Sequence, residues 1–321
     1  MSREIGSEFH IMPFEKGHGL VLPRPGSLVF SGRTAIEAVV RQTPDAHTAF
    51  LPSYCCDSMI VPFRDAGIEV KFYQVSWDNG LKVEIDGSAD IVLWCNYFGF
   101  KNEMPELNGV VIEDITHSML STVSAHSNSD YLVASLRKWE PVNCGGYCSV
   151  KMDGEVPSDE FVRLKSEAME LKADYLKDLN PKKKQQFLSM FGESNHWLAE
   201  HYSGLSIDSF SRDYLERVDV EHQRRIRREN AKTLYEGLSG KVQFMFPVEA
   251  MDCPLFVPVL LPNRNEVRTH LTKNEIYCPV HWPKPKGCES NIYDLELSLI
   301  CDQRYGVEDM KRIVSVIQEV L

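Results

Sequence analysis

The sequence predicts an α/β fold in which helices flank a mostly parallel central sheet, followed by a smaller α+β domain. Two observations support this prediction. Between residues 28 and 150, short β-rich apolar runs alternate with helical patterns, as expected of parallel strands joined by helices. Beyond residue 156 the strand signals stop, and helical patterns continue to about residue 240 before a second, shorter series of strands and helices. A chain of 321 residues can bury the cores of one large and one smaller domain.

The first part of the chain supplies the segments expected to form the large sheet and its helices. In chain order they read SLVF, GRTAIEAVVRQ, TAFLPS, DSMIVPFRDAG, VKFYQV, DIVLWCNYF, GVVIED, YLVASL and GYCSVK. Ligands of such sheets gather at the carboxyl ends of the strands, so polar residues at those ends are candidate site residues.

The middle of the chain is expected to be helical. EFVRLKSEAMELKADYLKDL predicts a helix, and the run PKKKQQ after it reads as a solvated loop, with a phosphate-binding patch as the alternative. SRDYLERVDVEHQRRIRRENAKTLYEGLSG predicts one long helix that ends before Gly240 and links two domains. Its apolar stripe consists of Leu215, Val218, Ile226, Leu234 and Leu238.

The predicted domains are residues 1–205, a large domain whose first segment can pack on the small domain, and residues 206–321, which include the linking helix. In the small domain, CPLFVPVLLP, EVRTHLTKNEIYCPVHWP and DMKRIVSVIQEVL read as strand, helix, strand and terminal helix.

Composition narrows the range of partners. A net charge of -11 argues against nucleic acid, because phosphate backbones are held by basic surfaces. The chain lacks a secretory signal and any apolar run of about 18 residues, which predicts a cytoplasmic protein with no membrane partner. The nine cysteines include the adjacent pair Cys55 and Cys56, so reduced thiols are expected. Cys144 and Cys148 have no second ligand pair at a metal-binding interval, so no zinc site is expected.

Three polar clusters lie at predicted strand ends. In SGRTA, Gly32 allows a close turn, and the amides of Arg33 and Thr34 could bind an anion at a helix N-terminus, although many ordinary helices begin after Ser-Gly. In GVVIEDITHSM, Asp114 ends a buried strand and needs a cation or a donor, and His117 follows. The third cluster places Ser135 three residues before Lys138 and the glycine pair of NCGG after it.

Several common chemistries do not fit these clusters. Ser-x-x-Lys also occurs in serine β-lactamases, but the chain has no Lys-Thr-Gly. The dinucleotide-binding and P-loop glycine patterns are absent as well. A pyridoxal phosphate enzyme, in contrast, requires a phosphate cup, a carboxylate for the pyridine nitrogen and a lysine for the aldehyde. The three clusters supply these groups in that order.

In both order and wording, the chain resembles the DegT family of sugar aminotransferases, which are fold-type I pyridoxal phosphate enzymes. The likeness rests on SGRTA, LPSYCC, NYFG, EDITHS, SLRKW and CGG in the family's sequence, and it continues through RRIRRENAKTLYEGL, LTKNEIYCPVHWP and LSLICDQRYGVEDMKRI. It covers nearly the whole chain. Two departures are the interval of three residues from Ser135 to Lys138, where the family has five, and NCGG in place of Gly-Glu-Gly-Gly.

The resemblance implies a role for each candidate residue. Lys138 would form the Schiff base and shuttle protons, Asp114 would face the pyridine nitrogen, and His117 would lie near the phenolic oxygen. Ser135, together with Gly32 and the backbone of Arg33 and Thr34, would hold the phosphate. Cys56 occupies the position where the family stacks an aromatic ring on the cofactor, and Tyr54 and Tyr97 are alternatives for that role.

The implied activity is transfer of an amino group from an amino acid donor such as glutamate to a keto sugar nucleotide, in a homodimer. The second subunit would contribute groups from Ser209, Ser211, Arg212 or the PKKKQQ segment. His281 and Trp282 would contact substrate or form a packed turn. A lyase or dehydratase of the same fold, and a non-catalytic relative that binds a metabolite, are the alternative functions.

Overall fold

The computed structural model describes residues 4–12, 16–100, 103–122, 125–126 and 128–321. Within it the chain forms two compact units. Unit 1 comprises Met1–Ser7, Asp45–Asp130 and Glu221–Leu321, and unit 2 comprises Glu8–Pro44 and Tyr131–Val220. The predicted domain boundary between residues 205 and 206 stays a prediction.

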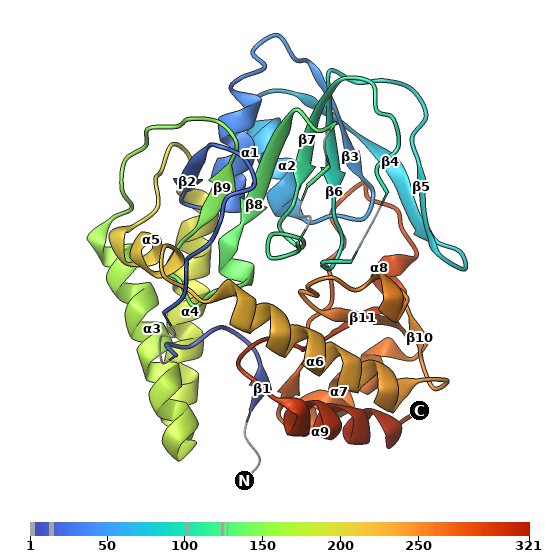
Figure 1. Cartoon of the computed structure of the whole chain (residues 1–321). Helices are drawn as coiled ribbons and strands as arrows, with labels where there is room; N and C mark the ends of the chain where they lie inside the picture. Colours follow the sequence, from blue (N-terminus) through green and yellow to red (C-terminus); the bar gives the residue numbers. More distant parts are fainter. Residues whose placement is uncertain (1–3, 13–15, 101–102, 123–124, 127) are drawn as a thin grey trace. The chain divides into compact units, whose positions relative to one another are not determined.

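Unit 1 contains a mostly parallel sheet with strand order β7-β6-β3-β4-β5 (Figure 1). Its strands are β3 (Thr48–Pro52), β4 (Glu69–Trp77), β5 (Leu81–Glu84), β6 (Ile91–Cys95) and β7 (Val110–Asp114), and helix α2 (Asp57–Asp65) follows β3. Neighbouring strands are parallel except for β5, which turns back antiparallel to β4. All five residues of β6 are buried, as expected for a strand that is covered on both faces.

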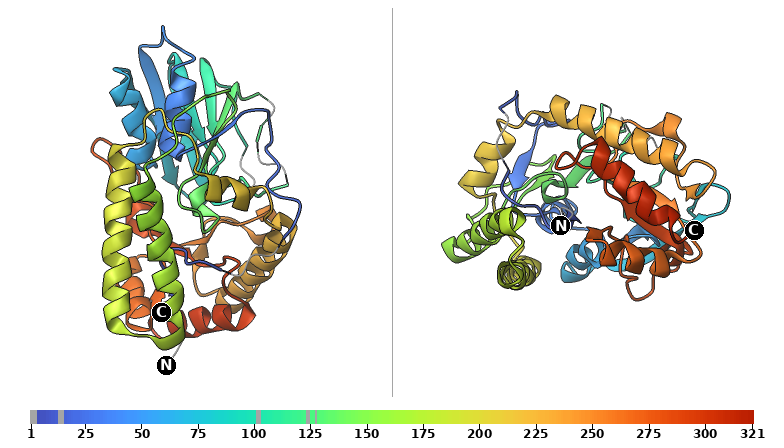
Figure 2. Two further views of the ribbon diagram at one scale, coloured as in Figure 1. Left: turned by 90° about the vertical axis from the view of Figure 1, so that its left-hand side faces the viewer. Right: turned by 90° about the horizontal axis from the view of Figure 1, so that it is seen from below.

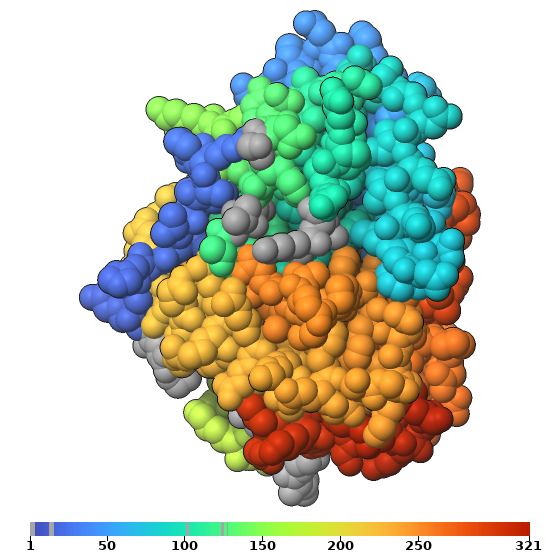
Figure 3. All heavy atoms as spheres, turned by 45° about the vertical axis from the view of Figure 1, so that its right-hand side comes forward, coloured from blue at the N-terminus to red at the C-terminus, as the bar shows by residue number. Residues whose placement is uncertain are grey.

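Unit 1 also contains a small antiparallel sheet with order β10-β11-β13 and the helices around it. Its elements are β10 (Gln243–Phe244), η2 (Val248–Ala250), β11 (Val257–Leu260), α7 (Arg264–Lys273), α8 (Ile292–Leu295), β13 (Glu296–Leu299) and α9 (Val307–Gln318), preceded by α6 (Val220–Leu238). A further parallel pair joins β1 (Ile5–Gly6) to β12 (Ile276–Tyr277). In Figure 3 the gold and orange atoms of α6 lie beside the red atoms of α9. These helices pack closely, because a Cβ on Gly237 would lie 2.7 Å from the Val314 side chain.

Unit 2 contains the antiparallel strands β2, β9 and β8, in that order. The elements of this unit are β2 (Ser27–Val29), α1 (Gly32–Val40), β8 (Tyr131–Ser135), η1 (Leu136–Lys138), β9 (Gly146–Cys148), α3 (Asp159–Asp178), α4 (Pro181–Glu200) and α5 (Ser209–Leu215). Helix α1 packs on β8 and β9. Helices α3 and α4 lie side by side along their whole length (Figure 2), joined by a core that includes Met169, Phe187 and Phe191.

The PKKKQQ segment is not a loop. It forms the first turns of α4, with Pro181 in the first turn and the Asn180 side chain accepting a hydrogen bond from the Lys182 amide at 3.0 Å. An Asn-Pro pair at a helix start is a recognised signal, because the asparagine caps an amide and proline lacks the hydrogen that would go unpaired. The lysines masked that signal in the sequence.

The predicted long linking helix is also wrong, since the segment forms two helices, α5 and α6. The backbone carbonyls of Leu215, Arg217 and Val218 accept hydrogen bonds from the amides of residues 20, 17 and 19, at 2.7, 2.6 and 3.0 Å. This pairing with the N-terminal segment replaces helical hydrogen bonds and ends α5. Of the predicted stripe, Ile226 is only partly buried, and the buried face of α6 runs through Gln223, Arg227, Asn230, Ala231, Leu234, Tyr235 and Leu238.

None of the helices in the described part of the chain has the length and apolar character needed to cross a membrane.

Candidate functional site

The turn between β2 and α1 places Gly32 against Ser135. A Cβ on Gly32 would lie 3.1 Å from the Ser135 Cβ, so the bare glycine brings the start of α1 close to the end of β8. Ser31 caps the helix, and its hydroxyl accepts a hydrogen bond from the Thr34 amide at 3.3 Å. Two of the predicted phosphate-binding residues therefore lie together at a helix N-terminus, where the helix dipole favours an anion.

The Thr34 side chain forms hydrogen bonds within the protein. Its side chain is fully buried, and its hydroxyl donates to the Tyr202 carbonyl at 2.7 Å and accepts from the Ser31 hydroxyl at 3.0 Å. Because the Thr34 amide also donates to Ser31, this residue fixes the beginning of α1.

The glycine pair of NCGG brings a second segment against the same turn. The Gly145 amide donates to the Phe30 carbonyl at 2.7 Å, and the Leu136 amide donates to the Gly145 carbonyl at 3.0 Å. A Cβ on Gly146 would lie 2.3 Å from the Ser31 carbonyl oxygen, which is far inside van der Waals contact. The glycine pair therefore allows close backbone packing around the turn at Gly32.

Lys138 ends the short helix η1, directly after the strand that carries Ser135. Its neighbours Leu136 and Trp139 are each 1% exposed, whereas Lys138 itself is exposed. The two buried residues anchor the backbone of this segment.

Ser211, one of the residues considered for the second subunit, is engaged within its own unit. Its hydroxyl accepts hydrogen bonds from the amides of Asn143 and Cys144 at 3.0 and 3.3 Å, and it donates to Asp208 at 2.5 Å. Ser211 is completely buried and supports the segment that leads from Lys138 to the glycine pair.

In unit 1, Asp114 ends β7 and is 6% exposed. Its Oδ1 atom accepts a hydrogen bond from the Thr116 amide at 2.8 Å, which orients the carboxylate. The preceding residue, Glu113, is fully buried and accepts hydrogen bonds from the Asn96 side chain at 2.7 Å and the His126 amide at 2.9 Å. Successive side chains point to opposite faces of a strand, so these two carboxylates have different surroundings.

His117 is fixed in orientation by the backbone. Its Nδ1 atom accepts a hydrogen bond from the Phe98 amide at 3.1 Å, so the neutral ring carries its proton on Nε2. Phe98 and Gly99 both have positive φ angles, and a Cβ on Gly99 would lie 2.1 Å from the Cys253 carbonyl oxygen. The turn that holds His117 thus depends on Gly99, the glycine of the NYFG motif.

His281 and Trp282 pack around His117. The Trp282 ring lies on the imidazole of His117, with centroids 5.7 Å apart and an interplanar angle of 29°. The His281 amide donates to Glu296 at 2.7 Å, and its Nδ1 atom lies 2.8 Å from the Ser298 hydroxyl. Burial raises the pKa of Glu296 to about 8, against the hydrogen bonds from His281 and Ser298 that favour the carboxylate.

The three candidates for stacking on a cofactor ring differ in exposure. Cys56 is partly exposed at the N-cap position of α2, and its Sγ atom lies 2.8 Å from the Ser58 hydroxyl. Tyr54 and Tyr97 are buried, with ring centroids 5.4 Å apart, and the Tyr97 hydroxyl donates to the Tyr54 carbonyl. Cys56 is the most accessible of the three.

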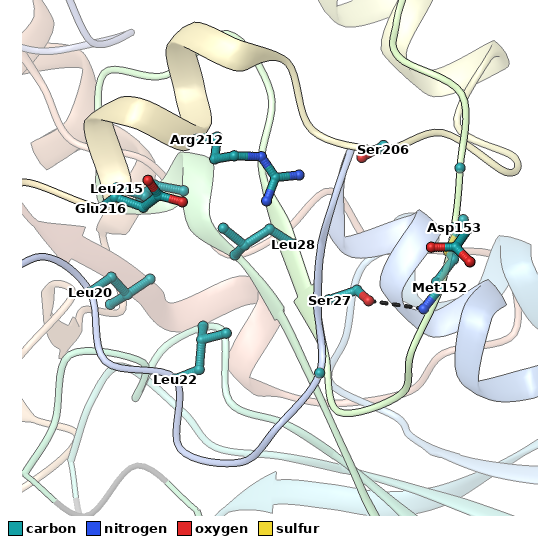
Figure 4. Close-up of a pocket in the computed structure, with 12 residues that line it drawn as sticks. Leu20, Leu22, Ser27, Leu28, Met152, Asp153, Ser206, Arg212, Leu215 and Glu216 are labelled. Atoms are coloured by element: carbon teal, nitrogen blue, oxygen red, sulfur yellow. Dashed lines mark hydrogen bonds between the residues drawn. The ribbon is translucent and has the colours of Figure 1, made fainter.

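A cavity of about 480 Å³ opens in unit 2 (Figure 4). Arg212 extends from α5 into it, and leucines form one wall: Leu20, Leu22, Leu28 and Leu215. Asp153 and Glu216 also line the cavity, so its charge is mixed, and none of the predicted cofactor-binding residues reaches it.

All nine cysteines are free thiols. Across the ranges that the structure describes, no group of three or more His, Cys, Asp or Glu side chains is placed to hold a metal ion.

Several solved structures share this fold. Spr1654 from Streptococcus pneumoniae, in its PLP form, is 11% identical, with a TM-score of 0.64 over 92% of this chain and 88% of that chain. A DegT DnrJ EryC1 StrS aminotransferase from Brucella abortus is 14% identical, with a TM-score of 0.58 over 92% and 85% of the two chains. DesI, solved in the presence of its TDP-sugar product, is 13% identical, with a TM-score of 0.64 over 92% and 80%.

No protein-family model matches the sequence, and no curated protein matches it. At these identities a structural likeness establishes the fold and leaves the activity open. The predicted α/β class and the fold part of the resemblance are confirmed: the chain has the fold-type I architecture of the DegT-type aminotransferases.

Proposed function

We propose that the protein is a pyridoxal phosphate-dependent aminotransferase that moves an amino group from an amino acid to a keto sugar carried by a nucleotide. The observation that carries this proposal is the contact of Gly32 with Ser135 at the start of α1, three residues before Lys138, in a chain with this fold. The cofactor, when bound, supplies an aldehyde that bonds to an amine and a ring that accepts electrons.

The residues of this chain fit that cofactor. Buried Nε atoms of Arg33 and Arg137 have no hydrogen-bond partner among the described residues, so the segments around Gly32 and Lys138 contain cationic donors in need of an anion. Gly32 and Ser135 would hold the phosphate at the N-terminus of α1. Asp114, oriented by the Thr116 amide, would accept a hydrogen bond from the protonated pyridine nitrogen.

Three side chains would act on protons. The Lys138 amine would condense with the cofactor aldehyde with loss of water, and after the donor amine displaces it, it would carry a proton between the substrate carbon and the cofactor carbon. Asp114 would keep the pyridine nitrogen protonated because a carboxylate next to it favours the cation. His117 would donate from Nε2 to the phenolic oxygen, since its Nδ1 atom already accepts from Phe98.

The substrate class draws support from the neighbours of the fold. DesI was solved with a TDP-sugar product, and Spr1654 in a PLP form. We extend these two features to this chain as part of the proposal, together with an amino acid donor such as glutamate, a homodimeric assembly and a cytoplasmic location. Because the net charge of -11 repels anions on average, binding of a diphosphate would depend on individual cationic side chains or backbone amides in the site.

A visible spectrum tests the proposal most directly. Purified protein incubated with pyridoxal phosphate should show the absorbance of a lysine-bound cofactor, and borohydride followed by peptide mapping should fix the cofactor to Lys138. Adding glutamate should convert the spectrum to that of the aminated cofactor. Lys138→Ala should abolish the band, while Lys151→Ala, which removes an exposed lysine of the same unit, should retain it.

Each alternative function has its own outcome in this experiment. No cofactor band at any concentration would favour a non-catalytic relative that binds a metabolite. A band that no amino acid donor converts would favour a lyase or dehydratase.

A further inference from the structure

Two arginines next to the turn at Gly32 each have an Nε atom without a hydrogen-bond partner among the described residues. Arg33 follows Gly32 as the second residue of α1, and Arg137 lies in η1 immediately before Lys138. Both side chains are partly buried, and neither Nε atom has a hydrogen-bond partner among the described residues. A buried donor without an acceptor destabilises the folded chain, and more so when it belongs to a charged group.

The surroundings add further positive charge. Lys165 and Lys172 of α3 approach the same place: the Lys165 amine lies 3.8 Å from the Glu8 carboxylate, and the Lys172 amine donates to the Glu8 carbonyl at 2.6 Å. Glu8 is the carboxylate whose charge acts on Arg137. Three cations, Arg137, Lys165 and Lys172, thus act on one carboxylate in unit 2.

The pKa values of these groups reflect their burial and the excess of positive charge around them. Burial lowers the pKa of Arg137, and the charge of Arg33 lowers it further, while Glu8 opposes both effects. Burial also lowers the pKa of Lys165 to about 8, and Arg137 contributes to that change. Although burial alone would raise it, the charges of Lys165 and Arg137 lower the pKa of Glu8.

An oxyanion would complete this group. Gly32 lies against Ser135, and this contact brings together the two segments that carry Arg33 and Arg137. Guanidinium groups bind carboxylates and phosphates through paired hydrogen bonds of fixed geometry, so two arginines on adjoining segments suit a multiply charged oxyanion. Hydroxyl groups are less available here, because the Thr34 hydroxyl is already bound to Tyr202 and Ser31. In a protein of net charge -11, this local excess of cations stands out.

We propose that Arg33 and Arg137 form an oxyanion-binding site beside Lys138, which holds a ligand phosphate or carboxylate through charge. This inference rests on the proposed function, which supplies two candidate oxyanions: the phosphate of the cofactor and a carboxylate of the amino acid donor. The phosphate has the better position, since Arg33 belongs to the first turn of the helix that starts at Gly32.

Pyridoxal phosphate and pyridoxal form a matched pair of ligands for the test, because they differ only in the phosphate. Equilibrium affinities would be measured by absorbance titration for the wild type, Arg137→Gln and Arg137→Lys. Arg163→Gln serves as the control, because Arg163 lies on α3 and its side chain is 65% exposed. Thermal unfolding of each variant shows that it is folded, and Arg137→Lys retains the charge should Arg137→Gln unfold.

We expect Arg137→Gln to weaken binding of pyridoxal phosphate by about 10- to 100-fold, the usual loss for a hydrogen bond to a charged group, and to leave pyridoxal binding unchanged. Arg137→Lys should lose less, and Arg163→Gln should match the wild type. Added salt should weaken pyridoxal phosphate binding more in the wild type than in Arg137→Gln. This difference would support a charge contact between Arg137 and the phosphate.

The second source of the oxyanion gives a different pattern. If the site binds the donor carboxylate, pyridoxal phosphate affinity stays constant in Arg137→Gln while KM for glutamate rises at similar kcat, which also supports the site. Unchanged affinity with unchanged KM, or equal weakening of pyridoxal and pyridoxal phosphate, would overturn the inference. A wild type that never bonds to the cofactor would instead refute the proposed function.

Discussion

At the scale of residues, Glu113 and Asp114 show how one dipeptide divides structural and chemical work. Glu113 binds Asn96 and His126, while the Thr116 amide donates a hydrogen bond to Asp114. The sequence shows two adjacent acids. It does not show which carboxylate forms hydrogen bonds inside the protein, because that depends on the face of the strand to which each side chain points.

Replacing Asp114 by Asn tests its assignment. We expect the rate of amino transfer to fall by at least about 100-fold, since a preorganised charge at the pyridine nitrogen is lost, while pyridoxal phosphate affinity changes less. Steady-state kinetics and absorbance titration would measure both. Asp130→Asn, at another carboxylate of unit 1, is the control, and a variant with normal turnover at position 114 would remove Asp114 from the mechanism.

Glu296 leads to a prediction about pH and stability. Its pKa is about 8 in the folded chain and about 4.5 in the unfolded chain, so between these values the folded state holds a proton that the unfolded state has released. The free energy of unfolding should therefore fall as pH rises from 4.5 to 8, by a few kcal/mol at most. Urea unfolding at pH 5.5 and 8 should show this loss in the wild type and a smaller loss in Glu296→Gln. Equal losses in the two proteins would contradict the assignment.

Arg137 marks the limit of sequence reasoning for single residues. An arginine beside a lysine reads as part of a solvated face, and nothing in SLRKW indicates that its Nε atom is buried. The proximity of Gly32 and Ser135 could be anticipated, in contrast, because both follow strands of the same predicted sheet.

At the scale of elements, the glycine pair is the most exacting feature of the site. A methyl group on Gly146 would meet the Ser31 carbonyl at 2.3 Å, so β9 or the start of α1 would have to move. Gly146→Ala should lower the free energy of unfolding by roughly 2 to 4 kcal/mol and weaken cofactor binding. Gly192→Ala in α4 is a matched control, because no atom lies within 4 Å of its added carbon and alanine favours a helix by about 0.5 to 1 kcal/mol. Denaturant unfolding that showed both variants as stable as the wild type would refute the packing argument.

The two errors in element prediction have local and distant causes. Asn180 and Pro181 indicate a helix start, but the three lysines that follow led to the prediction of a solvated loop. The end of α5 could not be found from local pattern, since its carbonyls pair with amides almost 200 residues earlier in the chain. Strands β5 and β10 were missed because they are short and partly exposed.

At the scale of the whole molecule, the fold class followed from the alternation of strands and helices and is confirmed. The two compact units do not follow from such local patterns, because each is assembled from separate stretches of the chain. Contacts between distant stretches decide that grouping, and a single sequence does not display them.

The distribution of thiols gives a prediction for the whole chain. Eight of the nine cysteines are buried and Cys56 is partly exposed. A thiol reagent should therefore modify about one thiol rapidly in the native protein and nine in denaturant, with peptide mapping identifying Cys56. If Cys56 lies on the cofactor ring, saturating pyridoxal phosphate should slow this reaction, whereas equal rates with and without the cofactor would place Cys56 elsewhere.

The hydrogen bonds that end α5 give residues 17–20 a role in the structure of a helix almost 200 residues further along the chain. The Leu20 amide satisfies the Leu215 carbonyl in the last turn of α5, which a helix end leaves without a partner, and the amides of residues 17 and 19 bind the carbonyls of residues 217 and 218 just after the helix. Removing the first 20 residues would take away the hydrogen-bond donors of those three carbonyls. The opening segment is thus part of what must assemble before α5 can stop where it does, and unit 2 is complete only when the two ends of its sequence have met.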